Sequence, residues 1–204
     1  MPFITFEGAD GAGKTTHIQL LADHFAQQGY PVLVTREPGG TQLGNEVRAL
    51  VLGKAVRPIS PLAEAMLMAA ARAQHVDEVL KPCLAEGRLI LCDRYIDSSL
   101  VYQGVALGLG LDLVISINEP AMAGLWPDLT ILLDVSPEVA YERSILGRQD
   151  ADRIESRGLA YYRQVCAGYQ SLAAKWPERF CVIDANRPLV VVQADVLQAV
   201  SSIL

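Results

Sequence analysis

Residues 8–15 read Gly8-Ala9-Asp10-Gly11-Ala12-Gly13-Lys14-Thr15 and follow an apolar run, Phe3–Phe6. They fit the pattern G-x-x-x-x-G-K-[ST], in which glycines let backbone N–H groups turn toward phosphate oxygens and the next helix adds its dipole. The lysine of this pattern reaches the β and γ phosphates, and the Thr15 hydroxyl ligates Mg²⁺. We therefore predict that a nucleoside triphosphate binds to Gly8, Ala9, Asp10, Gly11, Ala12, Gly13, Lys14, Thr15 and Thr16.

Short apolar runs rich in β-forming residues recur along the chain: Phe3–Phe6, Val32–Thr35, Leu89–Cys92, Leu129–Val135 and Phe180–Ile183. Because these runs are continuous rather than alternating, they predict strands covered on both faces, as in a parallel sheet. Segments with helical spacing separate them, namely Thr15–Gln28, Pro61–Glu86, Pro137–Leu146, Leu159–Trp176 and Leu189–Ile203. We predict an α/β fold, a five-stranded parallel sheet flanked by helices, with functional residues after the carboxyl ends of the strands.

The composition indicates one globular domain, residues 1–204. Hydrophobic residues make up 51% of the chain and charged residues 20%, which excludes an intrinsically disordered protein. The net charge is −6, so no overall positive field attracts nucleic acid or anionic lipid. No apolar run approaches the ~20 residues that span a bilayer, and the N-terminus lacks a signal peptide's basic region. We expect a cytoplasmic protein with neither nucleic-acid nor membrane partners.

The cysteines and histidines show no metal-ligand spacing. The cysteines form no Cys-x-x-Cys pair and lie in apolar sequence, which predicts free, buried thiols in a reducing compartment. His17 and His24 fall on one predicted helix, and no chemistry is assigned to them or to His75. The cysteines are Cys83, Cys92, Cys166 and Cys181.

An acidic residue, Asp93, follows the third predicted strand. This is where a strand-end carboxylate orients Mg²⁺ or its water ligands in proteins with a phosphate loop of this kind. The alternatives are a helix N-cap and an ion pair with Arg94. Beside the glycine-rich loop, the metal role is the prediction we adopt for Asp93 together with Thr15.

A bound nucleoside triphosphate leaves the fate of its γ-phosphoryl group open. A GTPase switch is expected to carry an Asn-Lys-x-Asp segment, which this chain does not contain, and a motor needs further domains. Transfer to a small phosphorylated acceptor instead predicts arginines after several strands, because the charge of two substrates must be neutralised. Such arginines are present: Arg36 and Arg94 after predicted strands, Arg72 on a predicted helix, and Arg143, Arg148 and Arg153 around a polar segment.

That polar segment, 146–153, is charged and contains glycine between two predicted helices. It has the composition of a mobile lid over a site, which would span about residues 143–155, and equally that of a solvated connection. Composition alone leaves both interpretations open.

Several motifs together resemble the thymidylate kinase family over nearly the whole chain. The most specific are 35–41, Thr-Arg-Glu-Pro-Gly-Gly-Thr, and 93–104, which begins Asp-Arg-Tyr and ends Tyr-Gln-Gly. Residues 6–16, 70–74, 127–130 and 152–155 add to the resemblance. It implies the P-loop nucleoside monophosphate kinase fold with a small lid, transfer of a phosphoryl group from Mg²⁺-bound ATP to dTMP, and a homodimer packed through helices. The alternatives are a kinase for another pyrimidine monophosphate or a deoxynucleoside, and a non-catalytic nucleotide-binding module.

The resemblance also implies roles for the acceptor site. Asp10 accepts a hydrogen bond from the 3′-hydroxyl of dTMP, while Arg36 and Arg94 hold its phosphate. Arg72 donates to a thymine carbonyl, and Tyr102 crowds the position of a ribose 2′-hydroxyl. The pocket for the base is lined by Ser99 and Gln103, with Met68 where many family members have phenylalanine. Met68 either packs on the base or belongs to the core.

The catalytic residues implied are Lys14, Arg94 and an arginine of the lid. Some family members carry a basic residue inside the phosphate loop, but that position here is Gly11. The lid is therefore expected to supply the charge, with Arg153 as the first candidate, then Arg148, and Arg143 on the side of ATP. Arg153 could instead pair with Asp152 or Glu155. For the dimer, Met66, Leu67, Val76, Val79 and Leu80 are candidates that equally suit the core.

Overall fold

The computed structural model describes residues 1–53, 58–146 and 158–204, and within them the predicted parallel sheet is confirmed. Its strands are β1 (Phe3–Glu7), β2 (Val32–Arg36), β3 (Leu89–Asp93), β4 (Leu129–Asp134) and β5 (Phe180–Asp184). They lie in the order β2-β3-β1-β4-β5, and all four neighbouring pairs are parallel. Four strands continue one residue beyond the predicted apolar run, to a polar residue, and β4 ends one residue before it.

The helices in the described residues include all the predicted segments and three regions besides. The predicted run 61–86 is continuous but contains a π-helical stretch, η1, between α3 and α4. The additional regions are α2, the pair α5 and η2, and α6. The bounds are α1 (Lys14–Gln27), α2 (Gln42–Leu52), α3 (Pro61–His75), η1 (Val76–Leu80), α4 (Lys81–Ala85), α5 (Ile96–Ser99), η2 (Leu100–Ala106), α6 (Leu111–Met122), α7 (Pro137–Leu146), α8 (Leu159–Lys175) and α9 (Leu189–Ser201).

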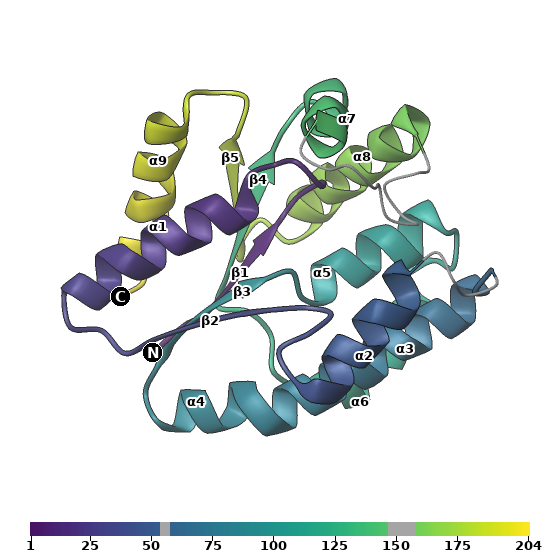
Figure 1. Ribbon diagram of the computed structural model, residues 1–204, viewed down its shortest axis with the longest axis horizontal. Helices are drawn as coiled ribbons and strands as arrows, with labels where there is room; N and C mark the ends of the chain where they lie inside the picture. The colour runs from purple at the N-terminus through teal and green to yellow at the C-terminus, as the bar shows by residue number, and fades with distance from the viewer. Residues whose placement is uncertain (54–57, 147–157) are drawn as a thin grey trace.

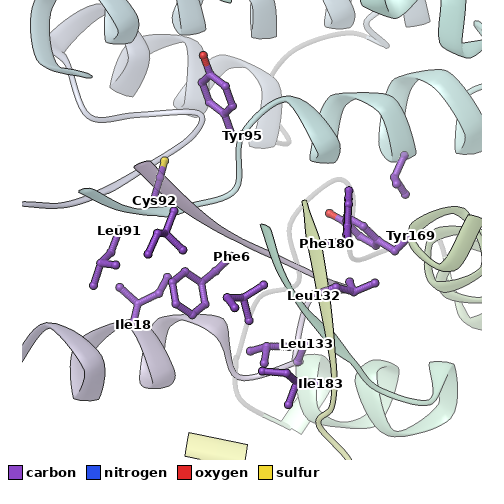
Figure 2. Packing of buried hydrophobic residues seen from close by; sticks show 14 of the residues in the cluster. Phe6, Ile18, Leu91, Cys92, Tyr95, Leu132, Leu133, Tyr169, Phe180 and Ile183 are labelled. Atoms are coloured by element: carbon purple, nitrogen blue, oxygen red, sulfur yellow. The ribbon is translucent and has the colours of Figure 1, made fainter. Parts of the chain in front are cut away.

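Helices cover both faces of the three central strands, β3, β1 and β4, whereas the outer strands β2 and β5 leave Val34 and Val182 exposed, so the prediction of strands covered on both faces is confirmed only for the centre of the sheet. Helices α1 and α9 lie on one face and α5 and α8 on the other, while α2, α3 and α6 form a group farther from the sheet (Figure 1). In the core, Phe6 and Leu91 pack with Ile18 of α1, and Leu132 lies toward Tyr169 of α8 (Figure 2). Burying each side chain of this size contributes about 1.5–3 kcal/mol.

The strand register brings three polar strand ends together. Phe6 pairs with Asp93 across β1 and β3, and Arg36 pairs with Asp93 across β2 and β3. The loops after β1, β2 and β3 therefore start side by side at the carboxyl edge, where open α/β sheets bind their ligands. Among the described residues, no helix combines the length and apolar character needed to cross a membrane.

Candidate active site

The loop after β1 has the backbone of a phosphate cradle. Gly8, Gly11 and Gly13 have φ values of 134°, 83° and 92°, which other residues rarely adopt. Helix α1 then begins at Lys14 without a side-chain N-cap. The N–H groups of its first turn are therefore left to bind an anion, and the helix dipole favours one there.

Helix α7 closes one side of this loop against Gly11. A Cβ atom at Gly11 would lie 2.5 Å from the carbonyl oxygen of Ala140 and 3.1 Å from the Cβ of Arg143. A basic side chain at position 11 would therefore displace α7. This packing agrees with the expectation that the additional catalytic charge comes from outside the loop.

Lys14 reaches across the loop. Its Nζ atom donates to the carbonyl oxygens of Gly8 and Ala9, at 3.0 Å each, and the residue is buried. Burial, and then the charge of Arg94, lower the pKa of Lys14, while the nearby carboxylates of Asp93 and Asp10 raise it. Within the described residues, the hydrogen-bond partners of this ammonium group are backbone carbonyls, so it can turn toward phosphate oxygens without breaking an ion pair.

Thr15 and Asp93 meet beside the loop and fit a magnesium ion. The Thr15 hydroxyl donates to Asp93 Oδ2 at 3.0 Å. The other oxygen, Asp93 Oδ1, is buried and has no hydrogen-bond partner among the described residues. Those residues contain no cluster of three or more His, Cys, Asp or Glu side chains that would hold a metal alone. A hard cation that keeps phosphate and water oxygens among its ligands matches this small oxygen donor set.

Arg94, Asp10 and Tyr102 form a second group at the same edge. Arg94 Nη2 donates to Asp10 Oδ1 at 2.8 Å, and the Tyr102 hydroxyl donates to Asp10 Oδ2 at 3.2 Å. The guanidinium also lies over the Tyr102 ring, 5.0 Å from its centre. Burial favours the neutral acid, but the charges of Arg94 and Lys14 outweigh it and lower the pKa of Asp10 to about 2. Asp10 is therefore an anion at neutral pH.

Arg72 is the centre of a buried polar group on α3. Its Nε atom donates to Glu37 Oε2 at 2.8 Å, and its Nη2 atom donates to the Tyr95 carbonyl at 3.0 Å and to Ser99 Oγ at 3.1 Å. Nη1 donates to Asn118 Oδ1. These hydrogen bonds use most of the N–H donors of the guanidinium, so its remaining donor points in a single direction.

Two hollows at this edge join into one cleft, because both are lined by Asp10, Glu37, Arg48 and Arg94. The first extends toward α3 and η2, and the second along the phosphate loop. The first is also lined by Pro38, Leu52, Met68, Arg72, Tyr95, Ser98, Ser99, Tyr102 and Gln103. The second is also lined by Gly11, Gly13, Lys14, Thr15, Thr16, Arg36, Asp93, Arg143 and Ser144.

Comparison with known proteins agrees with this geometry. The family described as thymidylate kinase matches residues 6–196. The chain belongs to the thymidylate kinase family. A thymidylate kinase from Pelotomaculum thermopropionicum is 48% identical over 202 residues, which are 99% of this chain and 94% of that protein. A thymidylate kinase from Bacillus velezensis is 43% identical over 203 residues, which are 99% of this chain and 96% of that protein. The crystal structure of thymidylate kinase from Ehrlichia chaffeensis superposes with a TM-score of 0.79 at 32% identity and covers 98% of each chain.

The thymidylate kinase motifs predicted residues that the fold gathers on the two sides of the cleft. Met68, Arg72, Ser99, Tyr102 and Gln103 line the first hollow. The second hollow contains Lys14, Thr15, Thr16, Arg36, Asp93 and Arg143, and Asp10 and Arg94 lie at the junction. Gly8, Ala9 and Ala12 shape the loop. Arg148 and Arg153, and residues 147–155 of the expected lid, lie outside the described residues.

Polar residues without a role in the sequence analysis include Arg48 and Glu37, which line the cleft, and His75, which contacts Glu37. Arg48 lines both hollows and donates to the Pro38 carbonyl at 3.2 Å. Glu37 accepts from Arg72 and lies 2.9 Å from His75 Nδ1, and His75 Nε2 lies 2.7 Å from the Thr35 hydroxyl. Glu37 belongs to the quoted motif 35–41, which was a signal for it. A single arginine on a helix and a single histidine gave none.

Glu7 is the last residue of β1, immediately before the phosphate loop, and is fully buried. Burial, and then the charge of Asp97, raise the pKa of the Glu7 carboxyl to about 7, although Arg94 and hydrogen bonds from Ser98 and the Tyr95 backbone oppose the rise. The folded state therefore binds this proton more tightly than the unfolded state. Stability contributed by protonated Glu7 is present below pH 4.5 and is lost as pH rises from 4.5 to about 7.

We accordingly expect the free energy of unfolding of the wild type to fall by roughly 2–3 kcal/mol relative to Glu7→Gln between pH 4.5 and pH 7.5. Urea unfolding of both proteins across this range measures the difference, in which the contributions of other carboxylates cancel. Equal pH slopes for the two proteins would show that Glu7 keeps an ordinary pKa.

Proposed function

We propose that this protein transfers the γ-phosphoryl group of ATP to dTMP, giving ADP and dTDP. The observation that carries the proposal is the cleft, in which a phosphate cradle meets a pocket at the half-buried ion pair of Asp10 and Arg94. A phosphoryl donor in the cradle and a monophosphate acceptor in the pocket would face each other at this junction. Phosphoryl transfer requires that the attacking and leaving oxygens lie in line.

The chemistry needs positioning and neutralised charge more than it needs a base. The attacking oxygen of a nucleoside monophosphate is already anionic, so direct in-line transfer needs no covalent enzyme intermediate. Lys14 supplies charge at the β and γ phosphates, and the first-turn N–H groups of α1 hold the same oxygens. A Mg²⁺ ion held by Thr15 and Asp93 would neutralise charge on the triphosphate. Arg143 faces the second hollow from α7, and we assign the remaining charge to Arg153, then Arg148.

In the acceptor pocket, each polar group is assigned to one part of dTMP. Arg94 and Arg36 are assigned to the dTMP phosphate, and Asp10, an anion with lone pairs left to accept, to the 3′-hydroxyl. Arg72 and Ser99, which are hydrogen-bonded to each other, are assigned to the base, together with Gln103, whose amide is held by Glu64 at 2.9 Å. Tyr102 fills the space beside the sugar.

Steady-state formation of ADP tests this function. Purified protein with Mg²⁺-ATP is assayed against dTMP, dUMP, UMP, dCMP, thymidine and a blank without acceptor. We expect kcat/KM to be highest for dTMP. Preference for another acceptor would move the substrate assignment within the kinase class, and ATP binding without turnover on any acceptor would favour a non-catalytic nucleotide-binding module.

Met68 provides a sharper prediction for the base. It is buried on α3 and lines the first hollow without being aromatic. Met68→Phe is expected to lower KM for dTMP about threefold to tenfold, because a ring stacks on thymine over more area than a thioether does. The matched control is Met66→Phe, on the exposed side of the same helix, which should leave KM unchanged. If Met68→Phe has no effect on dTMP kinetics, Met68 does not face the base.

We also propose a homodimer of single-domain chains, each 1–204 with a lid at about 143–155, in the cytoplasm. The free state of all four cysteines supports a reducing compartment. Among the residues considered for the interface, Val76 and Leu80 are buried within this chain, whereas Met66 is 53% exposed. Exposed apolar side chains lie on the group formed by α2, α3 and α6 (Figure 1): Leu43, Leu50, Leu62, Met66 and Leu113.

Introducing a charge on this group is expected to give a monomer. Met66→Glu would place a carboxylate in a desolvated interface, which costs several kcal/mol when it is unpaired. Leu20→Glu on α1, where Leu20 is 39% exposed, is the control and should leave the oligomer unchanged. Analytical ultracentrifugation of the three proteins distinguishes these states. A wild-type monomer, or a dimeric Met66→Glu variant, would contradict this interface.

A further inference from the structure

We propose that Glu7 is a positioning residue for the acceptor phosphate, which holds Arg94 in its gripping orientation through the hydroxyl groups of Ser98 and Tyr169. The inference rests on the role proposed above for Arg94. Glu7 lies outside the set of residues that line the two hollows, whereas Arg94 lines both. Glu7 would therefore act on the substrate through the residues that it holds, and Arg94 is the one of these assigned to the phosphate.

The backbone at Arg94 shows why a support is needed. Arg94 has a φ of 71°, in the left-handed region that favours glycine. Its N–H donates to the Phe6 carbonyl at 3.0 Å, and the next N–H, of Tyr95, donates to Glu7 Oε1 at 2.8 Å. Adjacent residues of β1 thus fix the two peptide groups on either side of the strained residue. One of these two supports is the Glu7 side chain.

The same carboxylate also fixes the side chain of Arg94, through two bridging hydroxyl groups. Ser98 Oγ and the Tyr169 hydroxyl donate to Glu7 Oε2 at 2.6 and 2.9 Å. Arg94 Nη1 donates to these two hydroxyl groups at 3.1 and 3.0 Å. Each hydroxyl accepts from the guanidinium and donates to the carboxylate, and this direction requires that Glu7 accepts. Together with the 2.8 Å bond from Nη2 to Asp10, these contacts fix both terminal nitrogens of Arg94.

The balance of burial and charge around Glu7 disfavours its ionised form, and among the charged groups Arg94 is the one that favours it most. Burial and Asp97 on α5 disfavour its charge, whereas Arg94 after β3 favours it, and Lys14 of α1 is also coupled to it by charge. The tyrosine facing it from α8 is neutral, because burial raises the pKa of Tyr169. A carboxylate kept here in spite of its desolvation has Arg94 as its main favourable partner.

Glu7→Gln tests the inference because it keeps the shape and the acceptor for the Tyr95 N–H. It places an amide N–H₂ group toward the two hydroxyls, which must then reverse and oppose the Arg94 donors. We expect the Kd for dTMP, measured by titration calorimetry, to rise about tenfold, with KM for ATP changed less than about twofold. The control is Thr5→Val on the same strand, which removes a buried bond between the Thr5 and Thr130 hydroxyls at 3.1 Å and should leave the Kd unchanged.

Tyr169→Phe keeps the inference testable if Glu7→Gln does not fold. The ring remains, one bridging hydroxyl is lost, and we expect a Kd for dTMP about threefold higher. In the double variant the two effects should not add, because both interrupt one connection. Unchanged Kd in Tyr169→Phe, additive effects, or an equal loss of ATP and dTMP affinity in Glu7→Gln would each overturn the positioning role.

Arg94→Ala separates failure of this inference from failure of the role on which it rests. If Arg94→Ala weakens dTMP binding and Glu7→Gln does not, Glu7 has no positioning role and the assignment of Arg94 stands. If Arg94→Ala binds dTMP as the wild type does, Arg94 does not hold the phosphate, and both assignments are overturned.

Discussion

Lys14→Ala is expected to lower kcat for dTMP phosphorylation on the order of 10³-fold while the protein stays folded. Removal of one preorganised donor to a developing charge typically costs a factor of 10²–10³, and this donor carries a full charge. In the structure Lys14 Nζ has only the carbonyls of Gly8 and Ala9 as hydrogen-bond partners among the described residues. Few structural contacts are therefore lost with it, and we expect the transferred phosphoryl group to lose a charged donor.

Steady-state kinetics and thermal unfolding together check this expectation. Because Lys14 is buried, a second variant, Lys14→Met, fills the space of the stem and should be equally inactive with a smaller loss of stability. Lys81→Ala is the control for a lost lysine, since Lys81 is 46% exposed and pairs with Asp77 within one helical stretch. A folded Lys14 variant within tenfold of wild-type kcat would remove Lys14 from the catalytic assignment.

The sheet could be predicted from sequence because its signals are local. Strands buried on both faces need continuous apolar runs, and the helices between them need a repeating apolar spacing. Both patterns can be recognised in consecutive residues of the sequence. The segment 93–104 has no such local pattern. It mixes serine, glycine and tyrosine without periodicity, and its helical form, α5 with η2, depends on tertiary packing against α8.

The candidate site likewise has a part that is local in sequence and a part that depends on contacts between distant residues. The phosphate loop is a contiguous motif, and its glycine positions could be predicted from sequence because each part acts on its neighbours. The contact of Asp10 with Arg94 joins residues 84 positions apart, and that of Glu7 with Tyr169 joins residues 162 apart. Such contacts exist only once the strand register is fixed. The family resemblance supplied roles for residues that would touch a substrate. It supplied none for Glu7, which contacts Ser98 and Tyr169, or for His75, which contacts Thr35 and Glu37.

Asp93→Asn is expected to lower kcat about 10²-fold at fixed Mg²⁺ and to raise the Mg²⁺ concentration needed for half-maximal activity. Asp93 Oδ1 is a buried oxygen without a partner among the described residues, and Oδ2 accepts from the Thr15 hydroxyl at 3.0 Å. Asparagine keeps the shape but loses the negative charge, and its N–H₂ group cannot ligate a cation. If the buried oxygen is kept for the metal or its water, both effects follow from one substitution.

Asp134→Asn is the matched control, because Asp134 ends β4, on the other side of β1 from the strand of Asp93, and contacts Gln170 instead of Thr15. It should leave the Mg²⁺ dependence unchanged. Thermal stability measured with ADP at increasing Mg²⁺ gives a readout apart from turnover, and the Mg²⁺-dependent increase in Tm should shrink in Asp93→Asn alone. Parallel Mg²⁺ dependence in both variants would mean that Asp93 only holds the Thr15 hydroxyl and has no role toward the cation.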